Sequence, residues 1–173
     1  MRYLCILALL LLPSVVIAGE RLTPRPLDPI AADAFARALA RSAVVRSLVA
    51  TLEQSNVIVH IASSMQMPAG IVGTTRFVTS RGGYRYVRIT IGSDLSTTAR
   101  TAILGHELQH ACEIAASQAD DVEGLRQMFA REGAFDGGFF ETAGAIEIEK
   151  RVRLEVTTRQ DARSPAGSSS PGK

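Results

Sequence analysis

The chain of 173 residues contains no tryptophan, and aromatic residues make up only 5% of it. Surfaces that hold sugar rings or nucleobases depend on aromatic stacking, so this composition argues against both. Positive and negative residues are nearly balanced, with 19 Lys and Arg residues and 17 Asp and Glu residues. A formal net charge of +2 gives no basic stripe and no acidic tail, and no nucleic-acid partner is expected.

Long apolar runs are absent except near the start of the chain. Residues 1–18 begin with the positive Arg2, continue through the uncharged apolar run 4–12 and end on the small residue Ala18. This order is typical of a secretory signal peptide. An N-terminal membrane anchor is the alternative, but the run is short for a span, which needs about 20 residues.

Cysteine is nearly absent as well. Cleavage after residue 18 would remove Cys5 and leave Cys112 alone, so the exported chain would contain no internal disulfide. That favours a bacterial periplasmic or secreted protein over a disulfide-stapled module. We expect no stable membrane span after cleavage, and the oligomeric state is not predicted.

The rest of the chain suits one domain, residues 19–159, followed by a Pro/Gly/Ser-rich tail, 160–173, that is predicted to be disordered. Apolar periodicity predicts an α+β fold: a small antiparallel hairpin sheet packed against a central helix and a C-terminal helix. The expected helices cover about residues 30–53, 93–117, 120–131 and 139–156, and the expected strands cover 56–62, 71–79 and 84–91.

The chemistry lies at His106-Glu107-Leu108-Gln109-His110. Positions i and i+4 of a helix point the same way, so the two imidazoles can bind one metal ion. Glu107 follows the first histidine and can reach a water on that ion, whose pKa a zinc ion would lower. The spacing therefore predicts one Zn²⁺ per chain, with Glu107 as general base.

The helix that carries this motif is apolar on most sides, which predicts a central position in the fold. Only four of its residues look suited to water: Thr101, Gly105, Gln109 and Glu113. Two alternatives to a catalytic metal are a pair of core histidines bonded to backbone, and a closed structural zinc site. The closed site needs a fourth protein ligand and leaves Glu107 without a function. Cys112 does not fit as that ligand, because it is rotated away from the histidines on the helix.

A third ligand is required, and the chain has only one further histidine, His60, which is expected to be a core or edge residue of a strand. A downstream carboxylate is therefore predicted. Glu141 is preferred, because on the last helix it shares a small, apolar face that should pack inward. Glu147 is the next choice, although it lies beside Lys150 and Arg151 and resembles a solvated helix charge. Glu149 lies beside Arg153 and is interpreted in the same way, as a surface charge with a local pair.

The segments H-E-L-Q-H-A, residues 106–111, and F-E-T-A-G-A, residues 140–145, resemble the gluzincin zinc peptidases, and in size their smallest members. The resemblance implies that His106, His110 and Glu141 bind zinc and that Glu107 relays protons. It also implies that an extended peptide pairs with the edge strand before the motif helix, expected here at 84–91. Tyr84, Tyr86 and Arg88 on that strand are then the substrate-binding candidates.

Two features depart from the gluzincin pattern. No His or Tyr follows His110 to stabilise an oxyanion, which leaves Tyr84, Tyr86, Arg151 and Arg153 as substitutes. Ala145 stands where relatives often carry Asp, so the carboxylate that would orient a histidine is unassigned among Asp120, Asp121 and Asp136.

Three functions therefore compete. The first is an exported zinc endopeptidase. The second is a zinc-holding module that binds peptides without cleaving them, favoured by the missing oxyanion donor and by a domain too small for a deep specificity pocket. The third is a non-peptidase periplasmic protein with a coincidental motif.

Overall fold

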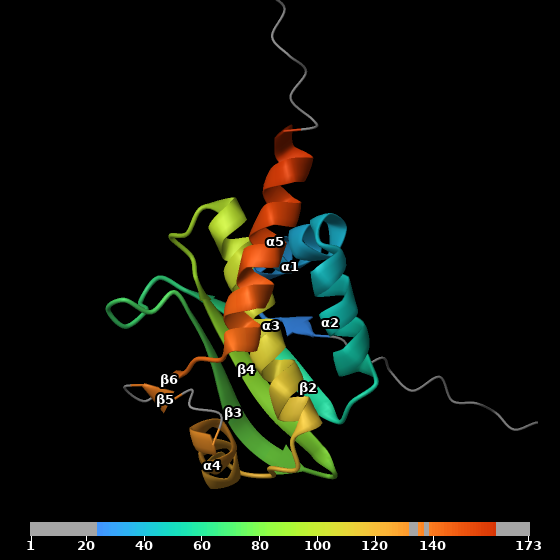
Figure 1. The fold of residues 1–173 in the computed structure, drawn as a ribbon, viewed down its shortest axis with the longest axis vertical. Helices are drawn as coiled ribbons and strands as arrows, with labels where there is room; N and C mark the ends of the chain where they lie inside the picture. Colours follow the sequence, from blue (N-terminus) through green and yellow to red (C-terminus); the bar gives the residue numbers. More distant parts are fainter. Residues whose placement is uncertain (1–23, 132–134, 137–138, 162–173) are drawn as a thin grey trace, which may run out of the picture.

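The computed structural model describes residues 24–131, 135–136 and 139–161, which form an α+β fold (Figure 1). The predicted signal peptide lies outside these residues, and so does the predicted tail except for residues 160 and 161, which continue the last helix. The elements are β1 (Arg25–Pro26), α1 (Pro29–Arg41), α2 (Ala43–Glu53), β2 (Val57–Ser64), β3 (Gly73–Arg81), β4 (Tyr84–Gly92), α3 (Thr97–Ala116), α4 (Val122–Arg131), β5 (Phe135–Asp136), β6 (Phe139–Phe140) and α5 (Ala143–Asp161).

Four strands form a mixed sheet in the order β1-β2-β4-β3. The predicted hairpin of β3 and β4 is confirmed, and Gly82 and Gly83 at its turn have φ of +61° and +80°, which suit glycine. The predicted edge position of the strand at 84–91 is wrong, because β4 pairs with β2 on one side and β3 on the other. Strand β4 lies inside the sheet because its inward side chains are mostly apolar, whereas β3, which is rich in Thr and Ser, lies at the edge.

Helix α3 is central, as predicted, with eleven of its 20 residues buried. It packs on the sheet, α1 and α2 flank it, and α5 crosses over it from the other side (Figure 1). Gly105 permits this close crossing, since a Cβ there would lie 2.8 Å from Val152 Cγ2 of α5. The expectation that Thr101 and Gly105 face water is therefore wrong, because α5 and the neighbouring helices cover α3. Among the described residues, no helix is long and apolar enough to cross a bilayer.

The single helix predicted over 30–53 is two helices separated at Ser42. This residue has extended backbone angles, φ −117° and ψ 122°, and its Oγ accepts the Val45 N–H as the N-cap of α2. The same hydroxyl donates to the Glu155 carboxylate of α5. A serine side chain can bind a nearby backbone N–H and so start a new helix in place of a continuous one. The spacing of apolar residues does not reveal such a break.

Arg85 caps the C-terminal end of α3 from the sheet. Its side chain projects from β4 toward the helices, and the residue is only 5% exposed. The guanidinium donates to the carbonyl oxygens of Ile114 (2.7 Å), Ala115 (3.0 Å) and Ser117 (3.0 Å). Helix ends leave carbonyl oxygens without partners, so one buried arginine here satisfies several acceptors and fixes α3 to the sheet.

Replacing Arg85 with Met should lower the free energy of unfolding by about 3 kcal/mol, because buried carbonyl oxygens lose charged donors. Urea denaturation followed by circular dichroism measures the effect. Arg88→Met on the same strand is the matched control, since Arg88 is exposed on the opposite face, and it should change stability by less than about 0.5 kcal/mol. Equal denaturation midpoints for the two variants would contradict the capping role.

Candidate metal centre

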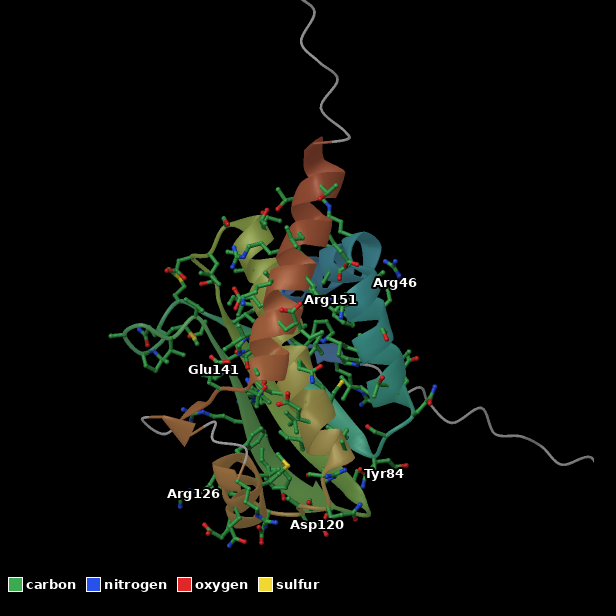
Figure 2. All side chains as sticks on the ribbon, viewed as in Figure 1. Arg46, Tyr84, Asp120, Arg126, Glu141 and Arg151 are labelled. Carbon is green, nitrogen blue, oxygen red and sulfur yellow. The ribbon has the colours of Figure 1, made fainter. Side chains whose placement is uncertain are left out.

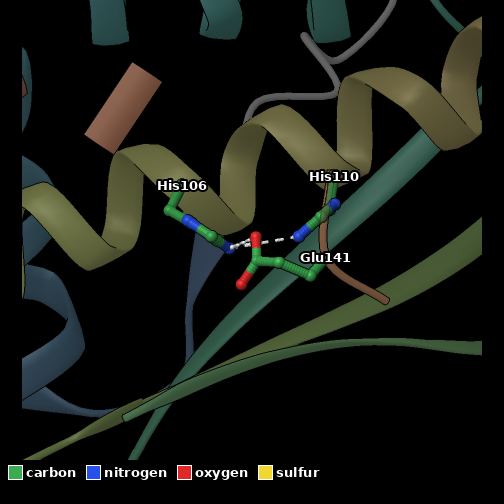
Figure 3. A group of neighbouring side chains, drawn as sticks. All are labelled: His106, His110 and Glu141. Atoms are coloured by element: carbon green, nitrogen blue, oxygen red, sulfur yellow. Dashed lines mark hydrogen bonds and ion pairs between the residues drawn. The ribbon is translucent and has the colours of Figure 1, made fainter. Parts of the chain in front are cut away.

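Helix α3 carries His106 and His110 on one face, one turn apart, and both are almost completely buried. Their Nε2 atoms lie 3.1 Å apart, and Glu141 Oε1 lies 3.4 Å from His106 Nε2 (Figure 3). One ligand atom from each of the three residues lies within 4.8 Å of the others. This group can hold a metal ion.

Glu141 reaches the histidines from a different place than predicted. It lies between β6 and α5, before the helix, because Thr142 caps α5: its Oγ1 accepts the Ala145 N–H at 3.0 Å. The side chain of Glu141 is 53% exposed, so the group is open to solvent on this side. The alternative, Glu147, is exposed on α5 and does not belong to the group.

A carboxylate faces the Nδ1 atom of each histidine. Glu113 Oε2 lies 2.9 Å from His110 Nδ1, and Glu149 Oε2 lies 3.5 Å from His106 Nδ1. The second distance is long for a hydrogen bond, and His106 Nδ1 is buried without a hydrogen-bond partner. When both rings are neutral, the carboxylates behind them favour the proton on Nδ1. The Nε2 lone pairs then face each other and Glu141, an arrangement that suits a cation.

Neither carboxylate is among the site residues predicted from the sequence, although one signal was present. Glu113 lies three residues after His110 and so shares its helix face, yet it was assigned to water. Glu149 was assigned to a surface pair with Arg153, and that pair exists at 2.6 Å. Three aspartates were candidates for the carboxylate that orients a histidine. Asp120 and Asp121 make no contact with either histidine among the interactions described. The side chain of Asp136 lies outside the described residues.

A hydrogen-bond network joins the two helices behind the site. Glu113 Oε1 accepts from Thr142 Oγ1 at 2.8 Å and from Gln109 Nε2 at 3.1 Å. Because Thr142 both caps α5 and follows Glu141, this network fixes the start of α5 and the position of Glu141 relative to His110. The same contacts lower the pKa of Glu113: burial opposes its charge, but the hydrogen bonds from His110 and Thr142 outweigh it.

The two histidines differ electrostatically. Burial, followed by the charge of His110, lowers the pKa of His106. Burial also disfavours the charged form of His110, but the hydrogen bond to Glu113 and the negative charges of Glu107 and Glu113 raise its pKa overall. Two adjacent imidazolium ions are thus disfavoured, and His106 is the ring held neutral, the form that binds a metal ion.

Glu107 lies against the edge strand β3. Its Oε2 accepts the Thr75 hydroxyl at 2.7 Å, and burial raises its pKa to about 7. The neighbouring Gly73 leaves the space that this carboxylate fills, since a Cβ there would lie 2.5 Å from Glu107 Oε1. Strand β3 therefore fixes the position of the Glu107 carboxylate, through the space at Gly73 and the hydrogen bond from Thr75.

A cavity of about 470 Å³ opens between α3, β3 and α4, and His106, Glu107, His110 and Glu141 line it. Beyond His110 its wall is apolar, and Phe129 meets the His110 ring edge to face, with centroids 6.0 Å apart. The other apolar residues at this end are Phe77, Ile114, Val122 and Leu125. Although the domain was expected to be too small for a deep specificity pocket, α3, β3 and α4 leave a cavity of this volume between them.

The predicted substrate residues do not line this cavity. Strand alternation places Tyr84, Tyr86 and Arg88 on the sheet face opposite to α3, and Figure 2 shows Tyr84 at an end of the sheet away from Glu141. His60 shares that face, where its ring stacks with Tyr86 at 6.5 Å. Arg151 and Arg153 do not line the cavity either, so none of the four proposed oxyanion donors is at the site.

Comparison with protein-family models, with curated proteins and with solved structures finds no match to this chain.

Replacing Glu113 with Gln keeps the shape of the side chain but removes the charge behind His110. We expect about 10- to 100-fold weaker metal binding, the usual effect of losing such a partner. Competition between the protein and a chromogenic chelator for Zn²⁺ measures this affinity. Glu147→Gln, an exposed change on α5, should leave it unaltered, and an unchanged affinity in Glu113→Gln would rule out the positioning role.

Proposed function

We propose that the chain is a zinc-dependent peptidase. The observation that carries this proposal is the placement of Glu107, a buried carboxylate beside the convergent His106, His110 and Glu141 group, in the wall of one cavity. Two imidazoles and one carboxylate are a donor set that zinc prefers, and three protein ligands leave a position for water or substrate. The resemblance to gluzincins at residues 106–111 and 140–145 points the same way.

Zinc bound by these residues would lower the pKa of a water and polarise a carbonyl group. Glu107, with a pKa of about 7, suits a group that accepts a proton near neutral pH and then releases it to a leaving amine. Thr75 and Gly73 hold its carboxylate, so they act as positioning residues for this transfer.

The substrate that fits this cavity is an extended peptide. Strand β3 is at the edge of the sheet, and its residues Gly73 to Phe77 line the cavity, so a peptide can add to it as a further strand. Because Glu107 delivers the proton to the leaving amine, the amine half of the peptide would lie near Gly73. The acyl half would then lie beside Phe77 and Phe129, which favours a bulky apolar side chain on the amino side of the cleaved bond.

A second candidate function is a zinc-holding module that binds peptides without cleaving them. The absence of all four predicted oxyanion donors from the cavity favours it. Binding of peptides by the zinc-loaded parent chain, with no product from any of them, would establish this function in place of peptidase activity. For either function we propose export directed by residues 1–18.

Glu107→Gln should keep the bound zinc and lose peptide hydrolysis by at least about 100-fold, because the amide accepts no proton. Mass spectrometry of a mixed peptide library measures cleavage, and elemental analysis measures zinc. The control is Glu147→Gln, which leaves the cavity intact and should cleave like the parent. Full activity in Glu107→Gln would contradict the assigned base.

A further inference from the structure

Charge is unevenly distributed between the two faces of the sheet. The four strands β1 to β4 contain five arginines and no Asp or Glu. One of them, Arg85, points toward the helices. The strand register places the other four on the opposite face together with His60. We call this set the basic sheet face: Arg25, His60, Arg76, Arg81 and Arg88.

Four of these residues form one row across the sheet, so the expectation of no basic stripe, which rested on the net charge alone, is wrong. Arg25 pairs with His60, His60 with Arg88, and Arg88 with Arg76, so the row includes every strand. Adjacent strands lie about 4.8 Å apart, which gives the row a length of roughly 14 Å. Tyr86 stacks beside His60 on this face, and Tyr84 next to Arg81 is 40% exposed.

The pair of Arg76 and Arg88 within this row opposes folding, because like charges on directly paired strand positions repel each other. Burial lowers the pKa of His60, and the charges of Arg25 and Arg88 lower it further. Arg76 and Arg88 are exposed, and no ion pair within the described part of the chain involves either. The described helices lie on the other side of the sheet, away from Arg76 and Arg88 (Figure 1).

We propose that the basic sheet face binds the headgroup surface of an anionic phospholipid bilayer. Arginine guanidinium groups bind phosphate through paired hydrogen bonds, and tyrosine suits the boundary between headgroups and acyl chains. The residues form an open array across a sheet and not a groove, which matches a broad surface better than a single polymer strand. Docking by this face leaves the cavity beside α3 on the side away from the bilayer.

Co-sedimentation of the full chain with lipid vesicles tests this binding. One vesicle type is phosphatidylcholine alone, and the other contains roughly one-third phosphatidylglycerol. We expect binding to the anionic vesicles that weakens as salt rises, because ions screen exposed charges. The leader, residues 1–18, also carries a positive residue, Arg2, so a preference for anionic vesicles does not by itself identify the sheet face. Binding through the leader would be the same in all variants of the sheet, so loss of binding in such a variant assigns it to this face.

The double variant Arg76→Gln with Arg88→Gln should lower the affinity for anionic vesicles about 25-fold, from a roughly fivefold effect of each arginine. The double variant Arg126→Gln with Arg151→Gln removes the same charge from the helices on the other side and should bind like the parent (Figure 2). Equal losses in both variants, or no binding of the parent chain, would overturn the proposal. A third result would also overturn it: the parent chain binds a single-stranded oligonucleotide more tightly than anionic vesicles, and only the Arg76→Gln with Arg88→Gln variant loses that binding. The face would then be assigned to nucleic acid.

Discussion

The structure depends on a buried pair of imidazoles that face each other across one turn of α3. Their Nε2 atoms lie 3.1 Å apart, and carboxylates from Glu113 and Glu149 stand behind their Nδ1 atoms. Polar groups buried in this way are costly unless they are partnered. The surrounding fold supplies those partners: α3 itself carries Glu113, and α5 with the segment before it carries Glu149 and Glu141. A cation between the imidazoles would complete the arrangement.

The fold and the site therefore share the same residues. Gly105 lets α5 cross α3 closely enough to bring Glu149 behind His106, and Thr142 both starts α5 and binds Glu113. The sheet contributes in two ways. Arg85 fixes the end of α3 to β4, while β3 leaves the space and the hydroxyl that hold Glu107. A change in any of these contacts would move a functional group as well as a structural one.

Patterns local in sequence predicted the motif helix, the hairpin and the cluster of His106, His110 and Glu141. Features that depend on distant contacts escaped prediction. The position of β4 inside the sheet follows from its pairing with β2, which lies across a long connection. The start of α5 follows from the Thr142 cap, so Glu141 was placed on a helix that begins after it. Glu149 resembled a surface charge because its pair with Arg153 is visible in the sequence, whereas its approach to His106 is not.

We propose that His106, His110 and Glu141 together bind one zinc ion, and the metal content of the purified chain is the first property to measure. Elemental analysis should find about one zinc per chain in the parent, and almost none in His106→Ala or Glu141→Ala with the fold retained by circular dichroism. A parent chain that holds no zinc even after reconstitution would show that these residues form no zinc site. It would leave the buried imidazoles as a core pair joined by hydrogen bonds.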